Sequence, residues 1–235
     1  LDASTIYEVP LLMEKEKLDE IVLKKLHVTT PTEVKLDKWK NFLNKFHNPA
    51  KEVTIGLVGK YFELKESYKS IAEAFIHAGA VNDCKVKVEW IHSEGLTDDN
   101  VKEKLSGLKG ILVAPGFGNR GIEGKISAIK FARENKIPFL GICLGMQCSV
   151  IEFARNVLGL KDAHSREMNP ATSAPVIDLL EAQKNISHMG GTMRLGSYPC
   201  RIVENTLAHK IYGKTDINER HRHRYEFNNE YTKLF

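Results

Sequence analysis

One cysteine of this sequence lies in a setting that suits nucleophilic chemistry. Residues 137–147 read Ile-Pro-Phe-Leu-Gly-Ile-Cys-Leu-Gly-Met-Gln, which predicts a short buried strand, a tight turn at Cys143 and then a helix. Glycines on both sides of the cysteine keep bulk away from it, as in the strand-to-helix elbow that presents a nucleophile. Because a helix N-terminus offers free N–H groups and a positive dipole end, we expect the thiolate of Cys143 to be favoured. A buried structural cysteine is the alternative interpretation.

Strands that alternate with helices must position this cysteine. From residue 52 onward, apolar stretches typical of strands are separated by stretches of helical spacing. The expected strands are 53–58, 85–91, 110–114 and 138–142, with looser candidates at 175–180 and 200–203, and the expected helices are 67–77, 98–105, 125–135 and 206–212. This alternation predicts an α/β fold with a doubly wound, mostly parallel sheet and helices on both faces. Gly116 and Cys143 both follow the carboxyl end of an expected strand, where such sheets build their sites.

The N-terminal stretch has a different texture. Apolar residues at helical spacing predict helices over 14–26 and 36–46, separated by a break in which Thr32 is a candidate N-cap. The sequence begins without a methionine, so we expect residues 1–51 to hold the end of a preceding domain and a helical linker. Residues 52–235 are then the second expected domain.

Composition narrows the possible functions. The net charge of the 235 residues is only +4 and the basic residues form no long run, which disfavours a nucleic-acid surface. No apolar run approaches the ~20 residues of a membrane span, and acidic residues near the start do not suit a signal peptide. The four cysteines show neither a CxxC pair nor metal-ligand spacing. We therefore expect a cytoplasmic protein with reduced cysteines, no metal, and no membrane or nucleic-acid partner.

Several motifs carry a resemblance to known proteins. Residues 141–147 resemble the nucleophile motif of class I glutamine amidotransferases. Further motifs, in their order along the chain, are similar to the glutaminase domain of the CTP synthase family. These motifs are 59–61 with 67–68, 116–121, 155–156, 190–196 and 219–226, while residues 6–10 resemble the end of that family's synthase domain. The resemblance implies a flavodoxin-like fold of the class I glutamine amidotransferase type.

The resemblance also implies an activity. In the family, the glutaminase domain hydrolyses L-glutamine, and the ammonia passes to the synthase domain of the same full-length chain. There UTP, activated by ATP in the presence of Mg²⁺, is aminated to CTP for pyrimidine nucleotide biosynthesis. GTP is the effector of the glutaminase step, the enzyme assembles as a homotetramer through its synthase domain, and the glutaminase domain itself needs no cofactor.

The resemblance assigns the reacting groups as well. Cys143 is expected to attack the side-chain amide of glutamine and to form a γ-glutamyl thioester. The N–H groups of Leu144 and Gly116 are the expected donors of the oxyanion hole. Where the family reads Pro-Gly-Gly-Phe-Gly, residues 114–118 read Ala-Pro-Gly-Phe-Gly. Pro115 has no N–H to donate and cannot turn to a positive φ, so the expected hole depends on Gly116.

Substrate and effector residues follow from the same resemblance. The glutamine pocket is expected to be lined by Gly116, Leu144, Gly145, Met146 and Gln147. Glu167 is expected to bind the α-ammonium group of the substrate, and Arg224 to bind its α-carboxylate with a bidentate fork. The residues expected near the GTP effector, or in a lid over the site, are Phe117, Arg120 and Arg194.

Several of these assignments have a plainer alternative. Met146 could pack in the core, and Glu167, Arg120 and Arg194 could be solvated surface charges. The run Arg-His-Arg-His-Arg at 220–224 could hold a metal or a phosphate, although no acidic or cysteine partner lies at ligand spacing.

One part of the expected machinery does not occur in the sequence. A cysteine amidotransferase needs a base for the thiol proton and a carboxylate that orients this base. The family supplies both from a His-Pro-Glu motif after the arginine cluster, and no such motif occurs in these 235 residues. We therefore expect the catalytic His and Glu beyond residue 235 and a domain that is incomplete at its C-terminus. The rival hypothesis is a degenerate module that binds glutamine or a partner without turnover.

Overall fold

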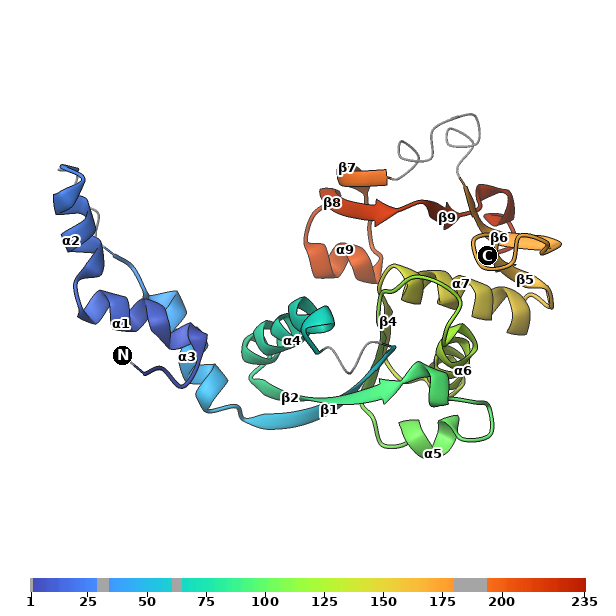
Figure 1. Cartoon of the computed structure of the whole chain (residues 1–235), viewed down its shortest axis with the longest axis horizontal. Coiled ribbons are helices and arrows are strands. Elements are labelled where there is room, and N and C mark those ends of the chain that lie inside the picture. The colour runs from blue at the N-terminus through green and yellow to red at the C-terminus, as the bar shows by residue number, and fades with distance from the viewer. Residues whose placement is uncertain (1, 29–33, 61–64, 180–193) are drawn as a thin grey trace. The chain divides into compact units, whose positions relative to one another are not determined.

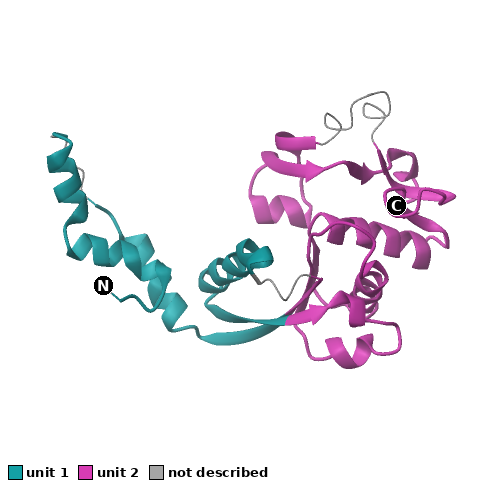
Figure 2. Ribbon diagram, viewed as in Figure 1, with its two compact units in different colours: residues 1–55, 65–89 teal, residues 56–64, 90–235 magenta. Residues whose placement is uncertain are grey.

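The chain forms two compact units. A computed structural model describes residues 2–28, 34–60, 65–179 and 194–235. Unit 1 holds residues 1–55 and 65–89, and unit 2 holds residues 56–64 and 90–235 (Figure 2). Every residue expected in the catalytic site belongs to unit 2. The expected domain division between residues 51 and 52 stays a prediction.

Unit 1 contains short helices and the beginning of a sheet. Its elements are the 3-10 turn Ile6–Glu8, α1 (Val9–Lys15), α2 (Leu18–Lys25), α3 (Asp37–His47), the first part of β1 (Lys51–Gly59), the 3-10 turn Lys65–Tyr68, α4 (Lys69–Val81) and most of β2 (Cys84–His92) (Figure 1). The single helix expected over 14–26 is wrong, because Lys17 adopts a left-handed φ of 54° between α1 and α2. The candidate cap Thr32 lies outside the described residues.

A cluster around Tyr7 ties the N-terminal segment to α3 and α4. Tyr7 is buried, and its ring lies between 5.5 and 6.0 Å from the rings of Trp39, Phe46 and His77. Its hydroxyl donates to the carboxylate of Glu73 and lies 2.9 Å from Nε2 of His77. Aromatic contacts and polar pairing together therefore hold these segments of unit 1.

Unit 2 is built on the main sheet. Its first elements are the end of β1, α5 (Val101–Leu105), β3 (Gly110–Val113), α6 (Ile122–Glu134), β4 (Phe139–Gly141) and α7 (Leu144–Asn156). The strand order is β2-β1-β3-β4, and β3 pairs with β4 in parallel with Ile111 opposite Phe139. This order is that of a flavodoxin-like, doubly wound sheet, so the predicted fold class is confirmed.

The core of unit 2 lies between the sheet and the helices α6 and α7. Its fully buried side chains include Val113 on β3, Ile151 on α7 and Ile177 in the second sheet. Cys148 also has an exposed fraction of 0% and belongs to this core. The apolar packing fixes α7, and therefore the elbow at its N-terminus, against β3.

The strand before the elbow is more exposed than expected. We expected a buried strand at 138–142, but Phe139 is 37% exposed and Leu140 is 57% exposed. The physical reason is its place in the sheet, because in the described part of the chain β4 is the edge strand and pairs with β3 alone. An apolar run of this length cannot distinguish a central strand from an edge strand.

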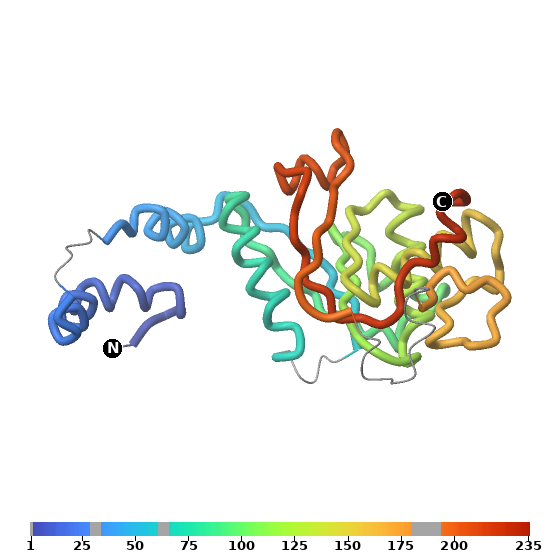
Figure 3. Tube along the Cα trace, turned by 90° about the horizontal axis from the view of Figure 1, so that it is seen from above, coloured from blue at the N-terminus to red at the C-terminus, as the bar shows by residue number. Residues whose placement is uncertain are grey.

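Two smaller sheets complete unit 2. β5 (Ala163–Ser165), β6 (Ala174–Leu179) and β9 (Tyr225–Phe227) form one, and β7 (Arg194–Arg201) pairs with β8 (Asp216–His223) to form the other. β7 and β8 are antiparallel and are joined through α9 (Leu207–Tyr212), as Figures 1 and 3 show. Of the strand expected at 200–203, only residues 200–201 are strand, and they form the end of the longer β7. The short β9 connects these two smaller sheets, because it follows β8 in the chain and pairs with β6.

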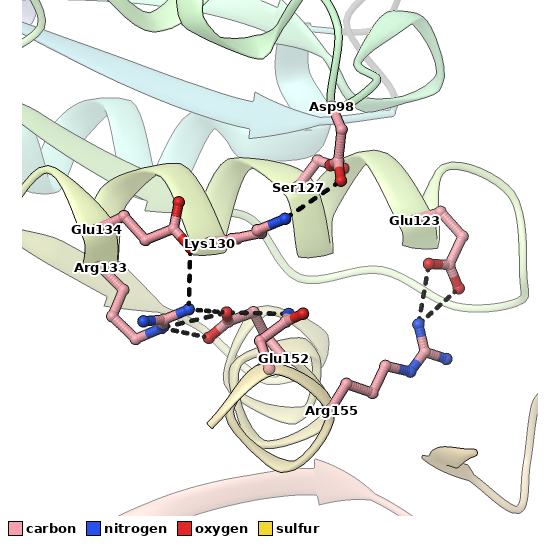
Figure 4. A network of polar contacts seen from close by, with 9 residues as sticks. Asp98, Glu123, Ser127, Lys130, Arg133, Glu134, Glu152 and Arg155 are labelled. Carbon is pink, nitrogen blue, oxygen red and sulfur yellow. Dashed lines mark hydrogen bonds and ion pairs between the residues drawn. The ribbon is translucent and has the colours of Figure 1, made fainter. Parts of the chain in front are cut away.

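An ion pair whose carboxylate is buried joins α6 to α7 (Figure 4). The guanidinium of Arg133 donates through Nε to both carboxylate oxygens of Glu152 at 3.1 Å, and through Nη2 at 2.7 Å. The Glu152 side chain is only 1% exposed, and the side chain of Asn156 donates to the same carboxylate at 3.1 Å. A bidentate pair of this kind also fixes the relative rotation of the two helices.

Candidate active site

Cys143 occupies a strained backbone position between β4 and α7. Its φ is 53° and its ψ is −107°, although it is not a glycine. Residues other than glycine avoid positive φ, and such strain is concentrated at functional sites. The nucleophile elbow expected from the sequence is therefore the observed local geometry.

Glycines make this elbow possible. A Cβ atom at Gly145 would lie 2.1 Å from the carbonyl oxygen of Val113, and one at Gly141 would lie 2.6 Å from the carbonyl carbon of Gly145. No side chain fits at either place without a shift of backbone. The two glycines therefore allow β4, the first turn of α7 and the end of β3 to approach one another closely.

Cys143 lines two adjoining cavities. The smaller has a volume of about 230 Å³ and is lined by Gly116, Phe117, Cys143, Gln147, Glu167, His223, Arg224 and Tyr225. The larger, of about 690 Å³, is also bordered by Met146 and by Arg220, His221 and Arg222 of β8. Five of the expected substrate or catalytic residues thus meet around the thiol, and they come from four separate segments of the chain.

Some expected residues take other places. Leu144 is 2% exposed and lines neither cavity, so only its backbone N–H is directed to the site, where it bonds to the Cys143 sulfur. Gly145 serves the elbow rather than the pocket wall. Met146 is 41% exposed at the larger cavity, so the core interpretation of this residue is wrong. Gln147 is buried and donates its amide to the Tyr225 carbonyl at 2.9 Å, which joins α7 to β9.

The residues expected at an effector site or lid are separated. Phe117 is 60% exposed and borders both cavities. Arg120 forms an ion pair with Glu94 at 3.2 Å and lines neither cavity. Arg194 pairs with Glu226 at 2.9 Å and also lines neither cavity. Of these three residues, only Phe117 therefore borders the cavities that Cys143 lines.

Opposite charges face each other in the smaller cavity. Burial raises the pKa of the Glu167 carboxyl, while the charges of Arg224 and Lys60 act in the opposite direction. Arg224 follows the last residue of β8, at the point where the chain turns into β9. A carboxylate and a guanidinium within one small cavity suit a ligand that carries both an ammonium and a carboxylate group.

The thiol of Cys143 is not activated as expected. Burial raises its pKa, and the nearby carboxylate of Glu167 adds to this effect. The N–H of Leu144 and the ammonium of Lys125 lower the pKa but do not outweigh burial. The expectation that the helix N-terminus favours the thiolate is therefore wrong for this arrangement of groups, because desolvation of the sulfur is the larger effect.

Two buried lysines hold the loop that follows β3. Nζ of Lys125 donates to the carbonyl of Ala114 at 2.7 Å. Nζ of Lys60 donates to the carbonyls of Phe117, Gly118 and Arg120, at 3.2 Å for Gly118 and 3.3 Å for Arg120. Sequence reasoning missed both, and one signal was present, since Lys125 interrupts the apolar face of α6 that buries Ile122, Ile126 and Ile129.

The proline of this loop causes no conflict in the observed conformation. Neither Pro115 nor Gly116 has a positive φ, and the first positive φ of the loop is at Gly118. The loop can therefore present the N–H of Gly116 without the backbone turn that proline forbids.

Two histidines lie beside Cys143 among the described residues that line these cavities. His223 borders both cavities, and its Nε2 lies 3.1 Å from Oε1 of Glu226. His221 borders the larger cavity, and burial together with the charge of Arg194 lowers its pKa. The residues that the structure describes contain no group of three or more His, Cys, Asp or Glu side chains that could hold a metal ion.

This elbow, sheet and pocket are those of a glutamine amidotransferase. A family model described as glutamine amidotransferase class-I matches residues 63–234, and the chain belongs to this family. Within it, the chain is similar to CTP synthases. It is 65% identical over 235 residues to the CTP synthase of Cytophaga hutchinsonii, a match that covers 100% of this chain and 44% of that protein. It is 58% identical over 239 residues to the CTP synthase of Methanocaldococcus jannaschii, covering 99% of this chain and 44% of that protein.

A solved structure is also similar. The glutaminase domain of Trypanosoma brucei CTPS with bound acivicin matches with a TM-score of 0.72 and 39% sequence identity, over 77% of this chain and 70% of that chain. The chain spans less than half the length of the curated relatives named above. In the described part of the chain, no helix has the length and apolar character needed to cross a membrane.

Proposed function

We propose that this chain is the glutamine-hydrolysing part of a CTP synthase. The observation that carries the proposal is the cavity in which Cys143, Glu167 and Arg224 meet beside Gly116. L-Glutamine offers an electrophilic amide carbon, an ammonium group and a carboxylate, and each finds a complementary group there. Similarity to CTP synthases over the whole chain supports this choice among the amidotransferases.

Recognition is proposed to depend on the two charged side chains. Glu167 accepts hydrogen bonds from the α-ammonium group, and Arg224 donates two parallel hydrogen bonds to the α-carboxylate. The rest of the glutamine molecule is bordered by Gly116, Met146 and Gln147. The turn at Leu144 and Gly145 lies behind it. This orientation directs the side-chain amide of glutamine to the thiol.

The proposed chemistry proceeds through a thioester. The sulfur of Cys143 attacks the amide carbon, and the negative charge that develops on the oxygen is stabilised by the N–H groups of Leu144 and Gly116. The carbon–nitrogen bond then breaks, and nitrogen leaves as ammonia after it takes up a proton. Water hydrolyses the thioester to glutamate and restores the thiol.

The thiol proton needs a base that we do not assign to this sequence. Burial raises the pKa of Cys143, which favours the thiol over the thiolate. The His-Pro-Glu motif that the resemblance implies does not occur in the 235 residues. His223 is not proposed as the base, because it belongs to the 219–226 motif, which the resemblance matches separately from the His-Pro-Glu motif.

The remaining proposals concern the longer enzyme. Residues 1–51 are proposed to be the end of a synthase domain with a helical linker, and residues 52–235 the glutaminase domain. The synthase domain would use ATP and Mg²⁺ to activate UTP and would carry the contacts of a homotetramer. GTP is the proposed effector, with Phe117, Arg120 and Arg194 in its site or in a lid, and the proposed location is the cytoplasm.

The chain alone is expected to bind L-glutamine and to react with acivicin but to hydrolyse glutamine close to background. The described residues provide the binding groups and the nucleophile, but we assign no base among them. Ammonia release measures turnover, and slowing of acivicin labelling by L-glutamine measures binding. D-Glutamine serves as the control, because its α-groups cannot meet Glu167 and Arg224 while its amide reaches Cys143.

Each outcome of this experiment has a meaning. Robust ammonia release would show that a base lies within these residues. Equal protection by the two enantiomers would contradict the proposed binding mode. A degenerate module would bind L-glutamine but would not be labelled covalently by acivicin. The similarity to CTP synthases does not favour this alternative.

A further inference from the structure

Lys125 is a buried lysine whose charge is not explained by packing. Lys125 is in the first turns of α6 and has an exposed fraction of 0%. Its helix neighbours Ile126 and Ile129 point into the apolar core. Complete burial of an ammonium group is costly, and an apolar side chain of the same length would fill this position more cheaply. Packing alone therefore does not explain a charged side chain at this position.

The contact of Lys125 leads directly to the oxyanion loop. Its Nζ donates to the carbonyl of Ala114 at 2.7 Å, and the N–H of Ala114 donates to the carbonyl of Val58 at 2.9 Å. Both polar backbone groups of Ala114 are therefore fixed. The next residue is Pro115, whose ring fixes its φ. Between the fixed Ala114 and the N–H of Gly116, ψ of Pro115 is the one soft torsion that remains.

The ammonium group also acts on the sulfur. The titratable groups that interact with Lys125 are Cys143, Cys148 and Lys60. Burial lowers the pKa of Lys125 to about 8, so the group is still mostly charged at neutral pH. Burial raises the pKa of Cys148 to about 12, so that residue stays a thiol. The positive charge of Lys125 therefore acts chiefly by lowering the pKa of Cys143, against burial and Glu167.

We propose that Lys125 is a positioning residue for the reaction of Cys143. It holds the Ala114 carbonyl so that the N–H of Gly116 stays directed at the oxyanion, and its ammonium charge stabilises negative charge on the sulfur. The inference rests on the proposed function of this site. It also gives Pro115 a role, because a fixed φ completes the constraint that Lys125 begins.

The test compares Lys125→Met with the wild-type chain and with Lys130→Met. Lys130 lies on the same helix and pairs with Asp98 at the surface, so it controls for loss of a lysine from α6. The rate of acivicin labelling is measured from pH 6 to pH 10 together with protection by L-glutamine. Lys125→Met should slow labelling about tenfold at pH 6 to 7, because the rate follows the thiolate fraction. The difference should shrink above pH 8, where Lys125 of the wild type loses its charge. Lys130→Met should match the wild type.

Other outcomes would overturn the inference. Wild-type labelling rates in Lys125→Met, or a slowing that is the same at every pH, contradict it. Slow labelling with weakened glutamine protection also contradicts it, because this would indicate a distorted pocket. If Lys125→Met does not fold, Lys125→Gln carries the same prediction, since it lacks the charge but keeps a donor. Failure of the wild type to be labelled, or protected by L-glutamine, would instead contradict the proposed function.

Discussion

Replacing Arg224 with methionine should weaken the binding of L-glutamine by about thirtyfold or more. The guanidinium borders the small cavity beside Cys143 and Glu167. Truncating one partner of a buried, hydrogen-bonded charge pair costs about 2–5 kcal/mol, since the other charge is then left unpaired. At about 1.4 kcal/mol for each factor of ten, the lower limit is roughly thirtyfold and the upper limit is above a thousandfold. The concentration of L-glutamine that halves acivicin labelling measures the effect.

A matched variant distinguishes recognition from general electrostatics. Arg201 lies at the exposed end of β7 and lines neither cavity, so Arg201→Met should change the protecting concentration less than about threefold. Equal losses in the two variants would indicate that net charge, rather than a fork at Arg224, attracts the substrate. Unchanged protection in Arg224→Met would remove this residue from the site.

Replacing Arg133 with methionine should lower the free energy of unfolding by about 3–5 kcal/mol. The substitution leaves the carboxylate of Glu152 buried at 1% exposure with a single remaining hydrogen bond, from Asn156. Urea denaturation monitored by circular dichroism measures the change.

Glu134 provides the control for this ion pair. It lies 3.5 Å from the same guanidinium, but its side chain is 52% exposed. Glu134→Ala should therefore cost no more than about 1 kcal/mol, as exposed pairs usually do. The double variant Arg133→Met with Glu152→Met should recover most of the loss, because an apolar pair leaves no charge unpaired. A similar cost in Arg133→Met and Glu134→Ala would contradict the assigned burial.

The alternation of strands and helices was enough to predict the sheet and the elbow. Strand ends follow from apolar runs and glycines, so Gly116 and Cys143 could be assigned to one edge of the sheet. Glu167 and Arg224 could not be found in this way, because each lies in a polar stretch without periodicity. Their assignment came from a resemblance, and the geometry now shows both at the cavity of Cys143.

Most of the errors come from effects that are not local in the sequence. The exposure of Leu140 depends on which strand ends the sheet, and the pKa of Cys143 depends on burial by distant segments. Lys60 binds the carbonyl of Gly118, 58 residues along the chain, and Lys125 binds that of Ala114, 11 residues away, and no spacing rule reveals either contact. The break at Lys17 is an exception, because its left-handed backbone is a local feature. It was missed because no glycine marks the position.

The most direct test of the account is to identify the cysteine that reacts with acivicin. The intact chain is labelled with and without an excess of L-glutamine, digested, and its peptides are analysed by mass spectrometry. The account predicts labelling at Cys143, suppressed by L-glutamine, with Cys84, Cys148 and Cys200 unmodified. Labelling of Cys148, or labelling of Cys143 that L-glutamine does not suppress, would contradict the assignment of the nucleophile and its pocket.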